Sequence, residues 1–116
     1  MEPLEYYYDS INRNAIIVKP KDPFFNWQNQ VFPEDEPIHE LDENNIYLIR
    51  EMESNQAIRT WLKKNFEDIF INELNDWSAD KDSWPKNRTY KMFTDWFDVE
   101  IHSLVLDLEE FPVTKD

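Results

Sequence analysis

The 116-residue chain contains no glycine, and this absence restricts the backbone more than any other feature of the sequence. Glycine adopts positive φ without steric cost, so any turn that needs positive φ must use another residue here. Asparagine and aspartate tolerate that region best, and the chain has eleven asparagines. We therefore expect the pair Asn44-Asn45 to form such a turn.

The missing residue types also exclude several classes of chemistry. Phosphate-binding loops and dinucleotide fingerprints need glycine where backbone amides approach phosphate, and the nucleophile elbow of hydrolases is equally disfavoured. The chain has no cysteine for a thiol nucleophile or a cysteine zinc site, and its two histidines, His39 and His102, cannot form a three-histidine metal centre. We expect no cofactor and no metal, and a non-enzymatic protein is favoured over an enzyme.

Composition indicates one folded domain despite a net charge of −13. Eighteen aromatic residues supply apolar surface that disordered acidic chains lack, and the length is that of a common single domain. No apolar run is long enough to span a membrane, and the start Met-Glu-Pro does not resemble a signal peptide. We therefore expect a soluble protein located in the cytoplasm.

The charge is distributed unevenly along the chain. Residues 34–43 carry six acids and no Lys or Arg, and residues 99–116 carry five acids and one Lys. Residues 77–98 balance four acids against four basic residues. The acidic residues of the first segment, which we call the acidic loop, are Glu34, Asp35, Glu36, Glu40, Asp42 and Glu43.

Hydrophobic patterns predict the elements of the first half. The β-branched run at residues 14–19 predicts a strand closed by Pro20. Asp22 followed by proline predicts a helix over 23–30, with Asp22 as its N-cap. Residues 33–45 read as a solvated loop, and Ile46 to Ile49 as a second strand.

The second half contains the clearest helix of the chain. Between Ser54 and Leu74 apolar residues recur at the helical period of about 3.6 residues, which predicts the main helix that covers the sheet. A third helix is expected from about Thr89, with Asn87 or Arg88 near its cap. Residues 99–108 are apolar on both alternating sides, so they predict a long strand in the centre of the sheet.

These elements predict an α+β fold with the order β-α-β-α-α-β. We expect a single domain over residues 12–116, preceded by an N-terminal extension at 1–11. Its small sheet of three or four strands is packed by about three helices, with the last strand central. The order of the other strands and the oligomeric state stay open.

Three segments together resemble a family of small bacterial α+β proteins of unknown function. They are Lys19-Pro20-Lys21-Asp22-Pro23-Phe24, Trp84-Pro85-Lys86-Asn87-Arg88-Thr89 and Trp96-Phe97-Asp98-Val99-Glu100-Ile101-His102-Ser103, accompanied by Trp27, Tyr47-Leu48-Ile49 and Phe93. The resemblance covers roughly residues 12–108 and implies a single α+β domain from a bacterium. It implies no activity and no cofactor.

Six residues are candidates for binding a small molecule or an anion. Trp84, Lys86, Asn87 and Arg88 place an aromatic ring, two cations and an amide near a helix start, which favours an anion or a carboxylate. Glu100 and His102 lie two residues apart on one face of a strand, so the carboxylate can orient the imidazole. The alternative interpretation is structural, with Trp84 packed under a helix, Arg88 paired to a local acid and His102 bonded to a neighbour.

Two hypotheses of function follow. The net charge disfavours nucleic acid, because phosphate backbones need a basic surface. We favour a non-enzymatic interaction module, inhibitor-like or immunity-like, whose acidic loop and residues 107–110 meet a basic protein partner. The alternative is a small-molecule or anion binder, or a minor enzyme, with a pocket near Trp84, Arg88 and His102.

Overall fold

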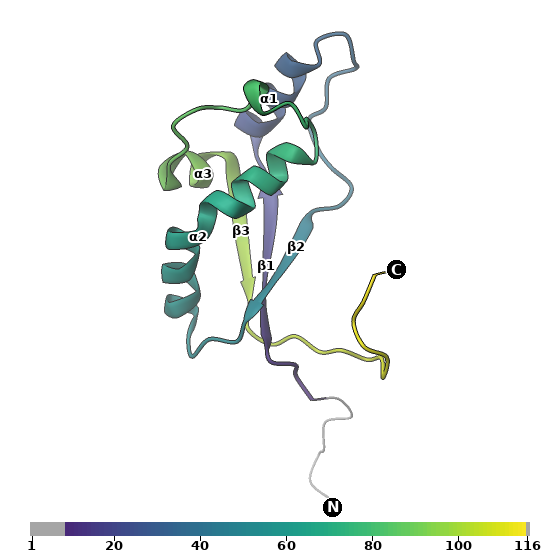
Figure 1. Ribbon diagram of the computed structural model, residues 1–116, viewed down its shortest axis with the longest axis vertical. Helices are drawn as coiled ribbons and strands as arrows, with labels where there is room; N and C mark the ends of the chain where they lie inside the picture. The colour runs from purple at the N-terminus through teal and green to yellow at the C-terminus, as the bar shows by residue number, and fades with distance from the viewer. Residues whose placement is uncertain (1–8, 116) are drawn as a thin grey trace, which may run out of the picture.

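The chain forms a three-stranded antiparallel sheet with its helices packed on one face, in a computed structural model that describes residues 9–115 (Figure 1). In chain order the elements are β1 (Arg13–Pro20), α1 (Asp22–Val31), β2 (Asn45–Arg50), α2 (Asn55–Asn75), the 3₁₀ turn η1 (Lys81–Ser83), α3 (Tyr90–Trp96) and β3 (Phe97–His102). The predicted α+β class and the order β-α-β-α-α-β are confirmed.

The central strand is β1, and the prediction that the last strand is central is wrong. The strand order is β2-β1-β3, and β1 pairs antiparallel with both neighbours. β3 ends at His102, so it is shorter than the predicted strand over 99–108. The leucines beyond it at positions 104, 106 and 108 are 67%, 50% and 61% exposed. Their alternation suggested two covered faces, but the helical layer does not extend over them.

Side-chain caps fix the starts of two of the helices. Ser54 Oγ accepts a hydrogen bond of 3.0 Å from the Ala57 amide at the start of α2. Thr89 Oγ1 accepts one of 3.1 Å from the Met92 amide at the start of α3. Both predicted starts are confirmed, but the expected cap of α3 at Asn87 or Arg88 is wrong, because Thr89 occupies the N-cap position. The predicted cap of α1 is wrong, because Lys21 occupies the N-cap position and Asp22 lies inside the first turn, where its charge favours the positive end of the helix.

Asn87 is the residue that replaces glycine. Its φ is 54°, and it is the one residue with positive φ among positions 9–115. The expectation for Asn44-Asn45 is wrong, because Asn45 is the extended first residue of β2. The reversal that needs a left-handed residue lies instead in the connection from η1 to α3, where asparagine tolerates it better than most residues.

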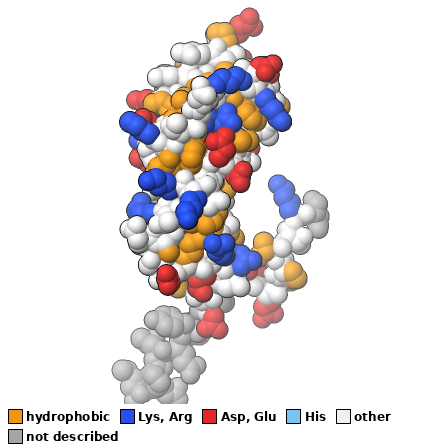
Figure 2. All heavy atoms as spheres, turned by 60° about the vertical axis from the view of Figure 1, so that its left-hand side comes forward, with side chains coloured by type: hydrophobic (Ala, Val, Ile, Leu, Met, Phe, Trp, Pro, Cys, Tyr) orange, Lys and Arg blue, Asp and Glu red, His pale blue; other side chains and the backbone are white. Residues whose placement is uncertain are grey.

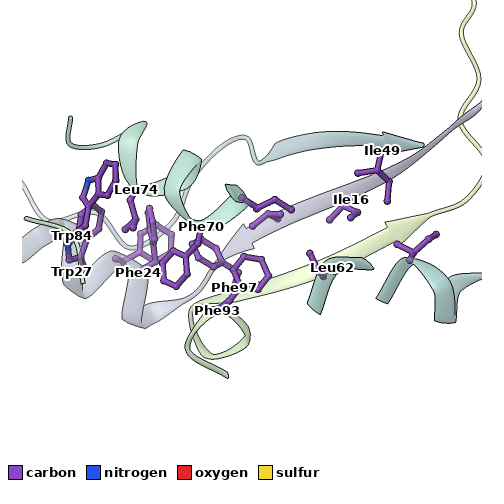
Figure 3. Packing of buried hydrophobic residues seen from close by; sticks show 14 residues of the cluster. Ile16, Phe24, Trp27, Ile49, Leu62, Phe70, Leu74, Trp84, Phe93 and Phe97 are labelled. Carbon is purple, nitrogen blue, oxygen red and sulfur yellow. The ribbon is translucent and has the colours of Figure 1, made fainter. Parts of the chain in front are cut away.

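The core lies between the sheet and the helices. Figure 3 shows aromatic rings gathered at one end of this core, with Ile16, Ile49 and Leu62 toward the other end. Phe24, Phe70, Phe93 and Phe97 are each no more than 2% exposed. Two tryptophans close the aromatic end, and their indole N–H groups donate to backbone carbonyls, Trp27 to Ser83 O and Trp84 to Ser78 O, each at 2.8 Å. Both rings are thereby buried without an unsatisfied donor.

Candidate functional site: the acidic end

The acidic loop is held in a defined position by one side-chain amide. Asn29 Nδ2 donates to the Ile38 carbonyl at 3.0 Å, and Asn29 Oδ1 accepts from the Ile38 amide at 2.9 Å. The side chains of Ile38 and Leu41 pack against the core, whereas the six acidic residues of the loop are exposed. The loop therefore presents its carboxylates to solvent from a backbone that is fixed at its middle.

A second group of acids, from the end of α2, lies beside this loop. Asn45 Nδ2 donates to Glu73 Oε2 at 2.6 Å and to Asp76 Oδ2 at 2.8 Å. The Tyr47 hydroxyl donates to the same Glu73 oxygen, and Asn72 Nδ2 donates to the Tyr47 oxygen at 2.8 Å. These five side chains, which we call the polar cluster, tie β2 to the last turns of α2.

Burial changes the acid strength of two members of the polar cluster. Glu73 is 4% exposed, and desolvation raises its pKa above the usual range, although hydrogen bonds from Asn45 and Tyr47 oppose that effect. Desolvation together with the neighbouring Glu73 also raises the pKa of Tyr47 far above that of a free tyrosine, so the phenol stays protonated as a donor.

The polar cluster and the acidic loop enclose a pocket of about 270 Å³. Its lining consists of Pro20, Leu41, Glu43, Asn44, Asn45, Glu73, Asp76 and Trp77. Three carboxyl groups meet there and no Lys or Arg is present. The last turn of α2 also carries no basic residue, so the negative end of the helix dipole adds to the negative potential. The pocket is suited to a positively charged group such as a basic side chain.

Sequence reasoning found the loop but missed Glu73 and Asp76. A signal was present for Glu73, because it follows Phe66 and Phe70 on the apolar face of α2 at the helical spacing. An acid on a core-facing stripe indicates a buried carboxyl that needs partners. No comparable pattern marks Asp76, because its place in the polar cluster depends on a hydrogen bond from Asn45, which is distant in the sequence.

The segment from Trp84 to Arg88 is occupied by contacts within the chain. Arg88 donates from Nε and Nη2 to Glu67 Oε1 at 2.9 and 2.6 Å, and from Nη1 to the Pro85 carbonyl at 2.8 Å. Lys86 Nζ donates to the Lys81 carbonyl at 3.2 Å, and Trp84 is buried. The structural interpretation of this segment therefore has direct support, and the Arg88 guanidinium is largely committed to Glu67.

Glu100 and His102 lie near each other, as expected, but away from that segment. His102 Nε2 and Glu100 Oε2 are 3.0 Å apart, and Lys19 Nζ is 3.5 Å from the other oxygen. The hydrogen bond with His102 and the charge of Lys19 lower the pKa of Glu100. His102 ends β3 whereas α3 joins its start at Phe97, about 16 Å away along the strand. The structure does not gather the six candidate residues, and none of them lines the pocket at the acidic end.

Charge is divided between the two sides of the fold. Residues 55–96 hold seven Lys or Arg and seven Asp or Glu, so the whole net charge of −13 belongs to the rest of the chain. Figure 2 brings the side of α2 and α3 forward and shows Lys and Arg side chains spread over it among hydrophobic ones. The acidic loop supplies six of the acids outside residues 55–96, whereas the segment of α2 and α3 is balanced.

Residues 9–115 contain neither a cluster of metal ligands nor a membrane-spanning helix. No group of three or more His, Asp or Glu in that range is arranged to hold a metal ion. No helix in that range has the length and apolar character needed to cross a membrane. Comparison with protein-family models, with curated proteins and with solved structures finds no match. The resemblance to a bacterial family stays a prediction from the three sequence segments.

Proposed function

We propose that this protein is a non-enzymatic interaction module, inhibitor-like or immunity-like, whose acidic end binds a basic protein partner. One observation carries the proposal: Glu43, Glu73 and Asp76 share a pocket at the negative end of α2, and no Lys or Arg lines it. A cationic side chain of the partner would relieve the repulsion among these three carboxyl groups, which face no Lys or Arg in the pocket.

The pocket has the size and lining for one long basic side chain. Its volume of about 270 Å³ is small for a drug-sized ligand, whose pockets begin at roughly 300 Å³. Leu41 and Trp77 offer apolar surface to the methylene stem of a lysine or arginine. The indole of Trp77 adds a face that attracts a cation. The exposed acids of the loop surround this position and would meet further basic residues.

The distribution of charge favours fast and selective association. An excess of acid at one end of the molecule steers a basic partner toward that end and repels nucleic acid. As part of the proposal, the module acts in the cytoplasm of a bacterium, in keeping with its sequence composition and with the family it resembles. The partner is a protein with a cluster of Lys or Arg, such as an enzyme that itself binds nucleic acid.

The test is capture of a partner from bacterial lysate at low salt, followed by elution with a salt step and mass spectrometry. Three immobilised proteins are compared: the wild type, the loop reversal Glu34→Lys/Asp35→Lys/Glu36→Lys, and a matched reversal of exposed acids elsewhere, Glu51→Lys/Glu53→Lys/Asp68→Lys. Both variants change the net charge equally, so only their position differs.

A basic protein retained by the wild type and by the matched reversal, but lost from the loop reversal, supports the acidic end as the binding surface. Equal loss from both variants would show attraction by net charge alone and would contradict a specific surface. Retention of no basic protein by the wild type would overturn the proposal.

A further inference from the structure

The face of the sheet opposite the helices carries an apolar strip that no element of residues 9–115 covers. Ile17 on β1 lies opposite Ile46 on β2, and Leu48 lies two residues further along. Ile46 and Leu48 are 62% and 49% exposed, and none of the three belongs to the core. We call these three residues the open-face strip.

Two arginines close one end of the open-face strip. Arg13 and Arg50 are paired across β1 and β2, and strand alternation places both on the same face as Leu48. Neither forms an ion pair with any residue in the range 9–115. Two like charges directly opposite each other are unfavourable, so this end of the face would be stabilised by acids.

Residues 10–11 and 103–110 form a segment beyond the sheet, which we call the arm. The Ile11 amide donates to the Val105 carbonyl at 2.8 Å, and Ser10 forms an isolated bridge with Leu106. The buried amide of Asn14 holds the base of the arm by donating to the Ser103 carbonyl at 3.0 Å. These bonds direct residues 103–106 past the end of the sheet, away from their own open-face strip.

The arm is complementary to the open-face strip in polarity, and its acids are complementary in charge to the end of that face where Arg13 and Arg50 lie. Leu104, Leu106 and Leu108 alternate, so in an extended segment they project to one side, and all three are largely exposed. The segment also carries Asp107, Glu109 and Glu110. Three exposed apolar side chains with adjacent acids thus match an exposed apolar strip with adjacent arginines. Both surfaces belong to the same chain.

We infer that a second copy of this chain binds here: the arm of each protomer packs across the open-face strip of the other, in a twofold-symmetric dimer. Self-complementary surfaces of this kind generate closed dimers, because each contact occurs twice. The bonds at Ile11 and Asn14 hold residues 103–105 beyond the end of their own sheet. The arm and the acidic loop lie at opposite ends of the molecule (Figure 1), so dimerisation leaves the acidic end free.

The net charge does not prevent this association. The six acids of the acidic loop lie at a distance from the arm, where salt screens them, because the Debye length at physiological ionic strength is about 8 Å. The contact itself brings acids of the arm to Arg13 and Arg50. Salt should therefore have two opposed effects on the stability of the dimer. It screens the repulsion between the two acidic protomers, and it also weakens the attraction of the arm acids to Arg13 and Arg50.

The experiment uses the absence of cysteine from the chain, because any introduced thiol is then the one reactive site. A tagged Leu48→Cys protein is mixed with an untagged Leu106→Cys protein and treated with a short bis-maleimide. We expect a mixed cross-linked dimer at about tenfold or more the yield obtained when Glu36→Cys replaces Leu106→Cys. Equal yields from the two mixtures would overturn the inference.

Light scattering on the purified wild type supplies the second readout. The wild type is expected to have the mass of a dimer. Leu48→Asp or Arg13→Glu/Arg50→Glu should raise the dissociation constant of the dimer about tenfold or more. Both changes are at exposed positions, and circular dichroism checks that the fold is kept. A monomer mass for the wild type at all concentrations contradicts the dimer. So does a cross-link formed within one chain by the Leu48→Cys/Leu106→Cys double variant.

These measurements need no partner protein, so the dimer and the proposed function can fail separately. The loop reversal Glu34→Lys/Asp35→Lys/Glu36→Lys should leave the dimer mass unchanged, whereas Leu48→Asp should leave capture of a basic partner through the acidic end intact. A loop reversal that abolished the dimer would overturn the assignment of the interface to the arm.

Discussion

The aromatic core and the buried carboxyl of the polar cluster, Glu73, are inaccessible to a similar degree but are held by different forces. In the core, the Phe93 ring lies 5.9 Å from that of Phe70 and 5.2 Å from that of Phe97, centroid to centroid, and no polar atom of these side chains needs a partner. In the polar cluster, Glu73 is as inaccessible as most core residues and depends on donors from Asn45 and Tyr47.

One helix passes through both regions within a single turn. Phe70 contributes to the aromatic core, and Glu73, three residues later on the same face of α2, contributes to the polar cluster. Burial of apolar area is non-directional, so the core tolerates exchange of one apolar side chain for another of similar volume. A buried carboxyl requires specific partners, and removal of one leaves a costly unsatisfied group. The two regions should therefore respond differently to mutation.

The largest effect is expected in the aromatic core. Phe93→Ala removes a fully buried ring and leaves a cavity, so the free energy of unfolding should fall by about 3 to 5 kcal/mol. Urea denaturation followed by circular dichroism measures it. The control is Phe111→Ala, a change at an exposed ring that should stay within about 0.5 kcal/mol. A similar small loss in both variants would show that the core is not packed as described.

A smaller effect is expected where the acidic loop meets the fold. Asn29→Ala removes both hydrogen bonds to Ile38, which should lower the free energy of unfolding by about 1 to 2 kcal/mol. Amide exchange in residues 34–43 should become faster, because the middle of the loop loses its anchor. Asn26→Ala, on the exposed side of the same helix, is the matched control. Unchanged exchange in the loop contradicts the role of Asn29.

Tyr47→Phe tests the polar cluster without changing its shape. The hydroxyl that donates to Glu73 and accepts from Asn72 is lost, while the ring remains. We expect a loss of about 1 kcal/mol in the free energy of unfolding, measured by urea denaturation. Tyr90→Phe serves as the control, since the ring of Tyr90 stacks near Phe93 within the aromatic group. A gain in stability from Tyr47→Phe would show that the polar cluster costs more than it contributes.

The smallest effect is the contribution of Glu73 to the pH dependence of the free energy of unfolding. Its pKa is raised on folding, so the folded chain binds more protons than the unfolded chain between the two pKa values. The free energy of unfolding of the wild type should therefore fall as pH rises from about 4.3 through the folded pKa of Glu73. Glu73→Gln cannot titrate, so its stability relative to the wild type should increase over that window.

The check is urea denaturation of both proteins across that range of pH, with Glu109→Gln as an exposed control. A difference between the wild type and Glu73→Gln that stays constant with pH would contradict the raised pKa. A difference that changes in the opposite direction would show that hydrogen bonds from Asn45 and Tyr47 outweigh burial.

The sequence by itself determined the elements whose signals are local. The spacing of apolar residues located α2 and its start near Ser54, and the six acids among residues 34–43 located the loop. Each of these depends on residues a few positions apart, so a one-dimensional pattern carries the information. The order of elements and the α+β class follow from them.

The tertiary structure alone decided the rest. The alternation at residues 99–108 matched a central strand, yet strand pairing places β1 in the centre and leaves three leucines outside. Asn87, and not Asn44-Asn45, takes the left-handed conformation, because the connection to α3 is where the chain reverses. The pocket at the acidic end joins Glu43 to Glu73 and Asp76 across some thirty positions. Contacts between distant segments depend on how the elements pack, and no local pattern in the sequence specifies that packing.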